Sequence, residues 1–129
     1  MMVDLMLRPD FHRYLIGTIF VLAGLLHFLK PAFYVKIMPD YIPRHKTMVY
    51  LSGAAEIAGG IGMFVPEVRP EAAFGLILLL LAVFPANIDM AVKSVKKRGW
   101  FDLYSLLLIL RLPLQFVLMY WVYWAGISI

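Results

Sequence analysis

A few polar side chains lie inside otherwise apolar stretches of the sequence, and their types could do chemistry. Arg111 lies in LLLILRLPLQFVLMYWVYW, residues 106–124, about 13 Å along a helix from the start of its apolar run at Leu103. Glu56 lies at a comparable depth in the run 48–65. An unpaired charge at the bilayer centre costs about 3 kcal/mol, whereas facing Arg and Glu side chains satisfy each other. We therefore expect Glu56 and Arg111 to form an ion pair.

Three further polar residues are predicted to join this pair. His27 in LLHFLK and Asn87 in FPANIDM lie near the ends of two other apolar runs, and Gln115 follows Arg111 by one turn on the same helix face. Each run thus supplies a hydrogen-bonding group between the membrane surface and its middle. Such an intramembrane polar cluster is typical of a cavity lining that binds a ligand. No residue in it is assigned a catalytic role.

Four apolar stretches must position these side chains: residues 11–29, 48–65, 72–92 and 103–124. Each is long enough to cross a bilayer, which takes about 20 mostly apolar residues in a helix. The 129-residue chain is 63% hydrophobic with a mean hydropathy of +0.84, whereas soluble domains are about half apolar. We expect an all-α fold, an integral membrane four-helix bundle that forms a single transmembrane domain over residues 1–129.

Prolines are expected to shape the bundle. Residues 30–46 contain three prolines, which forbid one continuous helix, so an interfacial loop is predicted between the first two helices. Its aromatic side chains either anchor it among the headgroups or cover the cavity. Pro85 and Pro113 lie inside the third and fourth runs, and we expect a kink at each.

The distribution of Lys and Arg predicts the orientation. The N-terminal segment and the turn PEVRPE, residues 66–71, carry three of these residues. The loop at 30–46 and the loop containing KSVKKRG, residues 93–99, carry eight: Lys30, Lys36, Arg44, Lys46, Lys93, Lys96, Lys97 and Arg98. By the positive-inside rule both of these loops are cytoplasmic and both termini lie outside, in what we expect to be a prokaryotic cell membrane.

Composition and charge exclude several kinds of chemistry. The chain has no cysteine, so it carries no disulfide exchange and no cysteine-ligated metal or iron–sulfur cluster. The net charge of +4 comes mostly from loops between apolar runs, where it acts on topology and anionic lipid, so no nucleic acid partner is expected. No metal site is predicted, because His27, Glu56 and Asp89 have no ligand-spacing motif.

Four short motifs resemble the DoxX-like family of small four-helix membrane proteins: AGLLHFLKP (23–31), LSGAAEIAGGIGM (51–63), VFPANIDMA (83–91) and RLPLQ (111–115). The resemblance covers nearly the whole chain. It implies a left-handed four-helix membrane bundle associated with redox processes, including a quinone-reducing thiosulfate oxidation complex. On these motifs the cluster of His27, Glu56, Asn87, Arg111 and Gln115 corresponds to the family's site.

The sequence leaves two functions open. The first is a redox-associated accessory subunit whose pocket binds a quinone or another small apolar ligand, such as a lipid, beside other membrane redox subunits in the bilayer. No electron carrier is evident in the chain itself, so we do not expect an enzyme that works alone. The second is a membrane-protein assembly factor or scaffold whose polar cluster is only a structural ion-pair network. The oligomeric state is left open.

Overall fold

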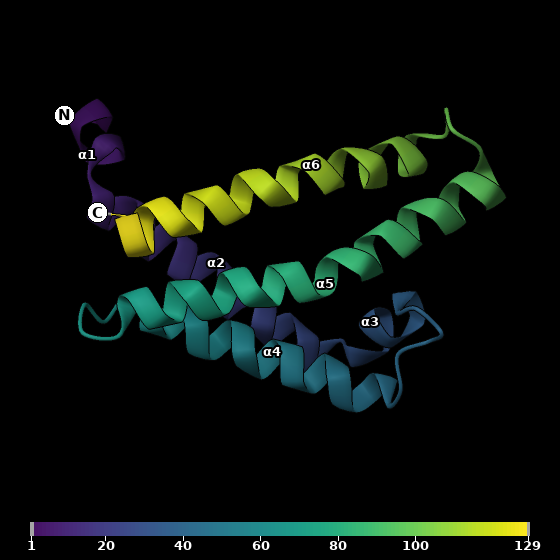
Figure 1. Ribbon diagram of the computed structural model, residues 1–129, viewed down its shortest axis with the longest axis horizontal. Coiled ribbons are helices and arrows are strands. Elements are labelled where there is room, and N and C mark those ends of the chain that lie inside the picture. Colours follow the sequence, from purple (N-terminus) through teal and green to yellow (C-terminus); the bar gives the residue numbers. More distant parts are fainter. Residues whose placement is uncertain (1, 129) are drawn as a thin grey trace.

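The computed structural model describes residues 2–128, which are mostly helical and contain no strand (Figure 1). Its helices are α1 (Met2–Leu7), α2 (Pro9–Leu29), α3 (Pro31–Ile37), α4 (His45–Gly62), α5 (Arg69–Arg98), α6 (Leu103–Tyr123) and a π-helix, η1 (Trp124–Ser128). The predicted all-α class is confirmed. Three helical segments, Pro9–Leu29, Arg69–Arg98 and Leu103–Ser128, are long and apolar enough to cross a membrane.

Proline and glycine set most of the helix ends. α2, α3 and α5 each have a proline in their first two positions, where the missing N–H would have no helical partner. α5 ends at Gly99, whose φ of 90° favours a residue without a Cβ. Asp102 then caps α6, because its carboxylate accepts a hydrogen bond of 3.0 Å from the N–H of Tyr104.

Several predicted boundaries were wrong. The KSVKKR segment was expected in a loop, but it is the last part of α5, because residues 93–98 contain no proline or glycine that would end the helix before Gly99. The interfacial loop at 30–46 contains the short helix α3, which begins at Pro31 and ends before Pro39. The second apolar run, 48–65, is helical from His45 to Gly62, and α4 is not among the three helices apolar enough to cross a membrane.

Both prolines expected to kink helices lie inside them. Pro85 is within α5 and Pro113 within α6, and each helix continues past its proline. The kinks themselves stay a prediction.

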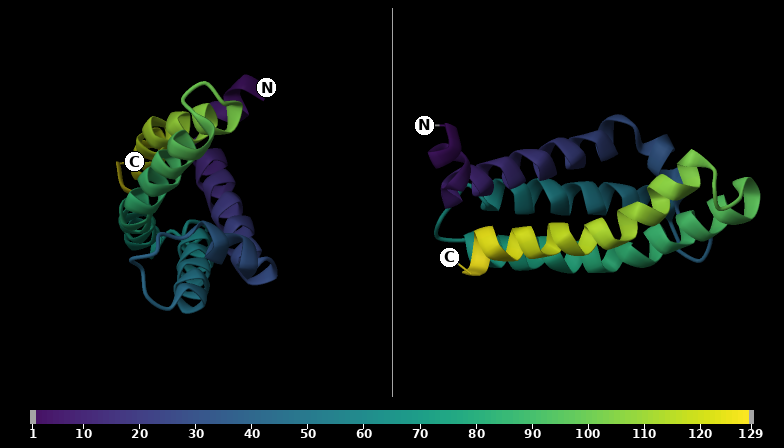
Figure 2. Two further views of the ribbon diagram at one scale, coloured as in Figure 1. Left: turned by 90° about the vertical axis from the view of Figure 1, so that its right-hand side faces the viewer. Right: turned by 90° about the horizontal axis from the view of Figure 1, so that it is seen from above.

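The helices pack in chain order. α4 contacts α2 on one side and α5 on the other, and α6 lies along α5. In two perpendicular views, the termini and the turn between α4 and α5 lie at one end (Figure 2). α3 and the α5–α6 connection lie at the other end. All eight basic residues of the two predicted cytoplasmic loops therefore belong to the same end of the molecule.

The contact between α2 and α4 is unusually close because glycines face each other. A Cβ on Gly24 would lie 2.6 Å from the carbonyl oxygen of Gly53, and a Cβ on Gly60 would lie 2.7 Å from that of Gly17. Without these side chains the two backbones approach each other, as in small-residue packing of membrane helices. α2 and α4 thus form a closely packed pair.

The main cluster of buried apolar residues lies toward the end near the termini. There Ile16 and Phe20 of α2 pack with Met63, with Leu76 of α5 and with Val122 of α6. Side-chain hydrogen bonds close this end: Arg13 Nε donates to Ala125 O at 2.8 Å, and Trp121 Nε1 donates to His12 Nδ1 at 3.0 Å. The opposite end lacks a comparable apolar core among the described residues, and it contains the cavity described below.

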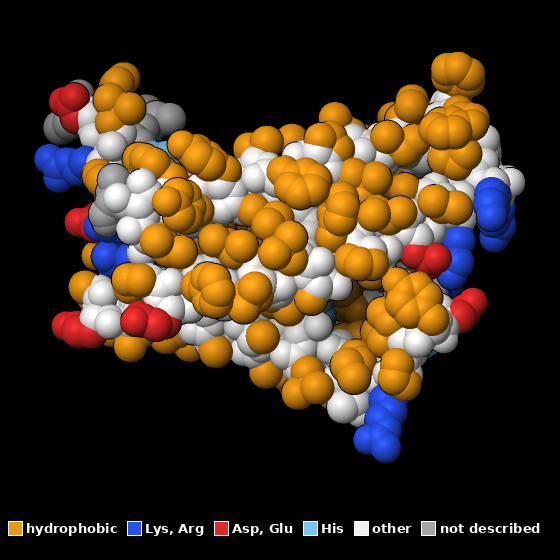
Figure 3. Space-filling model, viewed as in Figure 1, with side chains coloured by type: hydrophobic (Ala, Val, Ile, Leu, Met, Phe, Trp, Pro, Cys, Tyr) orange, Lys and Arg blue, Asp and Glu red, His pale blue; other side chains and the backbone are white. Residues whose placement is uncertain are grey.

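The surface agrees with contact to a bilayer. Figure 3 shows hydrophobic side chains over the middle of the molecule, whereas Lys, Arg, Asp and Glu gather toward its two ends. Large apolar residues such as Phe74, Leu107 and Val117 are exposed on α5 and α6. An apolar band between two charged zones is the pattern expected of a chain in contact with lipid.

Candidate functional site: a polar pocket between the helix pairs

A cavity of about 310 Å³ lies between the α2–α4 pair and the α5–α6 pair. Every helix from α2 to α6 contributes to its wall. Its lining consists of His27, Tyr34, Met38, Ile42, Met48, Val49, Ser52, Glu56, Leu79, Ala82, Val83, Ala86, Asn87, Met90 and Arg111. This volume is at the lower end of the range for small-molecule sites, which are about 300–1,000 Å³. Four of the five predicted site residues are in the lining; Gln115 is not.

One wall of the pocket carries His27 and Glu56. The Nδ1 of His27 lies 2.8 Å from the carbonyl oxygen of Ala23 and 3.4 Å from Glu56 Oε2. Because a backbone carbonyl only accepts hydrogen bonds, Nδ1 carries the hydrogen in the contact with Ala23. His27 Nε2 has no hydrogen bond to any described residue. His27 is thus held in one orientation with its second nitrogen unused.

Glu56 is the least satisfied side chain in this wall. Its side chain is 17% exposed, and its Oε2 is buried without a hydrogen-bond partner among the described residues. A buried polar atom without a partner costs about 1–3 kcal/mol. Such a group in a cavity marks a place where a ligand can supply the missing hydrogen bond.

Two neighbours of this wall were not predicted as site residues. Ser52 precedes Glu56 by one helical turn and lines the same pocket, and its hydroxyl makes no hydrogen bond to a described residue. The spacing of four residues could have identified it. Tyr34 of α3 stacks on the His27 ring, with centroids 3.9 Å apart and planes at 17°. Of the two roles left open for the loop aromatics, Tyr34 takes that of a cover.

Tyr34 stays a neutral phenol at ordinary pH. Its burial in α3 raises the pKa of the hydroxyl above the usual value, and the nearby Glu56 raises this pKa further, whereas Arg111 lowers it. The Tyr34 hydroxyl is thus close enough for both Glu56 and Arg111 to change its pKa.

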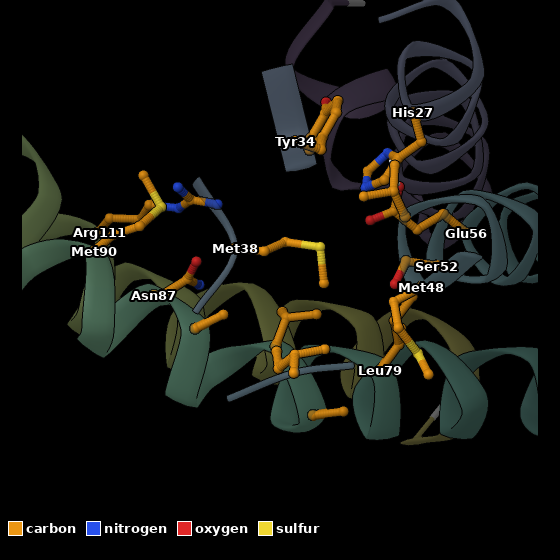
Figure 4. Close-up of a pocket in the computed structure, with 15 residues that line it drawn as sticks. His27, Tyr34, Met38, Met48, Ser52, Glu56, Leu79, Asn87, Met90 and Arg111 are labelled. Carbon is orange, nitrogen blue, oxygen red and sulfur yellow. Dashed lines mark ion pairs between the residues drawn. The ribbon is translucent and has the colours of Figure 1, made fainter. Parts of the chain in front are cut away.

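Arg111 stands alone on the opposite wall, and its predicted ion pair with Glu56 is wrong. No hydrogen bond or ion pair joins its guanidinium to any described residue, and the residue is exposed within the pocket. Figure 4 shows Arg111, Asn87 and Met90 on one side of the cavity, His27, Glu56 and Ser52 on the other, and Met38 between them. The two charges share a pocket without contact, because α4 and α6 each pack on α5 rather than on each other.

Asn87 and Gln115 form a pair of their own between α5 and α6. Asn87 Nδ2 donates to Gln115 Oε1 at 2.5 Å, and Gln115 Nε2 donates to the carbonyl of Leu80. Both side chains are buried. Gln115 thus donates to a backbone carbonyl of α5, the helix that contains Pro85. The predicted cluster of five residues is in fact two pairs and one separate cation.

The site offers hydrogen bonds and charge to a ligand but no obvious metal centre. Within the described part of the chain, no group of three or more His, Asp or Glu side chains is placed to hold a metal ion. The pocket has an acidic and histidine wall, a cationic wall, and an apolar middle. Its chemistry is that of binding a small, partly apolar molecule with polar ends.

Comparison with known proteins gives a family without a described activity. No curated protein and no solved structure matches the chain. A family model described as a domain of unknown function, DUF8561, matches residues 16–126. This range includes four long helices, α2, α4, α5 and α6, and the whole lining of the pocket, because its first member is His27 and its last is Arg111. The chain therefore belongs to the DUF8561 family.

Proposed function

We propose that this chain is a DoxX-like integral membrane protein that acts as a redox-associated accessory subunit and holds a quinone or another small apolar ligand in its pocket. One observation carries the proposal. A cavity of about 310 Å³ contains a carboxylate oxygen and a guanidinium that have no hydrogen-bond partner among the described residues. In an apolar environment unpartnered groups of this kind are costly, and a ligand that pairs with them offsets that cost.

In this proposal four helices cross the membrane. α4 is not among the helices that are apolar enough by themselves to cross, but its polar residues Ser52 and Glu56 face the pocket, and Gly53 and Gly60 face α2. Lipid therefore does not need to solvate them. The segments at the α3 end carry eight of the twelve Lys and Arg residues, which supports a cytoplasmic location of this end in a prokaryotic cell membrane, with both termini outside.

The accessory role follows from what the side chains can do. Histidine, glutamate and arginine bind, orient and exchange protons, but they do not carry electrons. A redox function would need a cofactor or a neighbouring membrane subunit. The pocket would then hold the quinone for that partner.

A second candidate, a membrane scaffold with a structural polar cluster, is favoured by the Asn87–Gln115 pair. These two residues are buried and use their hydrogen bonds to join α5 to α6. A structural role of this kind does not explain Arg111, because no hydrogen bond or ion pair connects its side chain to another described residue.

Binding of a quinone to the purified protein tests the proposal. We expect decylubiquinone to bind the wild type in native mass spectrometry with one molecule per chain. Arg111→Leu should weaken this binding about tenfold or more, because it removes the donors that face a quinone carbonyl, a hydrogen bond worth about 1.4 kcal/mol. His27→Ala should weaken it as well, because it removes a ring from the wall of the pocket. Lys97→Leu removes an equal charge outside the pocket and should bind as the wild type does. Binding that is unchanged in both pocket variants would favour the scaffold.

A further inference from the structure

The two walls of the pocket differ in whether their unused hydrogen-bonding groups donate or accept. At the His27–Glu56 wall the Nδ1 hydrogen is already used by Ala23. A neutral His27 therefore offers only an acceptor at Nε2, and an ionised Glu56 offers only acceptors. If one of these two residues is protonated, the other still offers a hydrogen-bond acceptor. The wall keeps at least one unused acceptor in each of these states.

The opposite wall offers donors. Arg111 has five N–H donors and no acceptor, and none of these donors is used by a described residue. Asn87 next to it already gives one N–H to Gln115. A ligand atom that pairs with Arg111 therefore has to be an acceptor, and an anionic oxygen suits it best because hydrogen bonds to charged groups are the stronger ones.

The middle of the pocket is apolar and adaptable. Met38, Met48 and Met90 line it together with valine, leucine and alanine side chains. Methionine side chains are flexible and favour contact with aromatic rings. Met38 lies between the two polar walls (Figure 4), so the body of a ligand that reaches both walls has to pass along this thioether.

We propose that the pocket selects small molecules with a hydroxyl group at one end and a carbonyl or acidic oxygen at the other, joined by an apolar or aromatic body. This inference rests on the proposed ligand-binding function and narrows its ligand class. The hydroxyl lies at His27 and Glu56, and the accepting oxygen lies at Arg111.

The hydroxyl is favoured over a second carbonyl for a simple reason. A hydroxyl both donates and accepts, so it pairs with the His27–Glu56 wall in each of its protonation states, whereas a carbonyl can only accept. Among quinone-like molecules, the pocket should therefore prefer forms that carry a hydroxyl over those with two carbonyls.

Two matched esters test the inference. Butyl 4-hydroxybenzoate and butyl 4-methoxybenzoate share a ring, an ester carbonyl and a butyl chain, and differ only at the para oxygen, which carries a hydrogen in the first ester and a methyl group in the second. We expect the hydroxy ester to bind detergent-solubilised wild type about tenfold more tightly in isothermal titration calorimetry, because its hydroxyl pairs with the unpartnered wall. Duroquinone, which has two carbonyls and no hydroxyl, should bind less tightly than the hydroxy ester.

Variants of the pocket residues test whether the preference for the hydroxy ester arises at the His27–Glu56 wall. The double variant His27→Leu/Glu56→Leu removes both acceptors and should bring the affinities of the two esters close together, whereas Arg111→Leu should weaken both by a similar factor. Glu67→Leu, in the turn outside the pocket, serves as the control and should keep the wild-type preference. The comparison of esters in the wild type requires no variant to fold.

The outcomes separate this inference from the proposed function. Equal or tighter binding of the methoxy ester or duroquinone to the wild type, with binding still weakened by Arg111→Leu, overturns the hydroxyl preference and leaves the pocket as a ligand site. If none of the three probes binds the wild type more tightly than Arg111→Leu, both the inference and the proposed function fail.

Discussion

At the scale of single residues, the polar side chains fall into groups with different tasks. His27 and Glu56 are close together but only partly satisfied, and Arg111 has no hydrogen-bond partner among the described residues. Asn87 and Gln115, by contrast, use their amides on each other and on α5. The first group is available to a ligand, and the second group holds two helices together.

The amide pair should therefore matter for stability. Gln115→Leu leaves Asn87 Nδ2 without its acceptor in a buried position, which should cost about 1–3 kcal/mol. The double variant Asn87→Leu/Gln115→Leu should recover part of this loss, with a coupling energy of about 0.6–1.7 kcal/mol, as for other hydrogen bonds within membranes. Reversible unfolding in mixed micelles measures each variant. Purely additive losses would mean that the two amides do not stabilise each other.

The residue types of the site were predictable, but their pairing was not. Depth along a helix follows from counting residues, and Arg111 and Glu56 do line one cavity. Contact also depends on which helices are neighbours and how each is rotated, and one residue changes the rotation by about 100° at 3.6 residues per turn. The sequence does not show that α4 and α6 are separated by α5. Ser52 was overlooked although its spacing from Glu56 was visible.

At the scale of helices, α4 is the element that organises the site. Gly53 and Gly60 fit against α2, Gly59 and Gly62 lie against α5, and the polar residues of α4 face the cavity. α5 extends through the basic segment to Arg98, because lysine and arginine are good helix formers that do not stop a helix.

Glycine replacements test this packing. Gly60→Ala places a Cβ 2.7 Å from the carbonyl oxygen of Gly17, and neither backbone can move without separating α2 from α4. We expect a loss of about 1–3 kcal/mol in stability. Gly75→Ala is the matched control, since a Cβ there has no atom within 4 Å and alanine is the better helix former by about 0.5–1 kcal/mol. Thermal denaturation in detergent compares the two. A Gly60→Ala variant as stable as Gly75→Ala would argue against the close α2–α4 contact.

At the scale of the whole molecule, packing at one end leaves space at the other. The apolar core and the bonds from Arg13 and Trp121 close the end near the termini, while the pocket lies toward the α3 end. Hydropathy predicted the apolar helices well, because crossing a bilayer requires long apolar runs. It could not predict the cavity, which depends on how two helix pairs meet.

The path of the chain across the membrane can be tested directly, because the chain has no native cysteine. Single cysteines at Lys46→Cys and Glu67→Cys flank α4. If α4 crosses, a membrane-impermeant maleimide should label Glu67→Cys from outside intact cells and Lys46→Cys only after the membrane is opened. Lys97→Cys should behave as Lys46→Cys does. Labelling of both flanks of α4 from the same side would show that it does not cross.

The most direct measurement of the central claim is native mass spectrometry of the protein purified from its own membranes. We expect the wild type to carry one small molecule per chain, because Glu56 and Arg111 lack partners inside the pocket. Arg111→Leu should lose this molecule while its helical content, measured by circular dichroism, stays unchanged, and Lys97→Leu should retain it. A wild type that carries no small molecule, or a bound molecule that survives Arg111→Leu and His27→Ala alike, would contradict the assignment of the pocket as a ligand site.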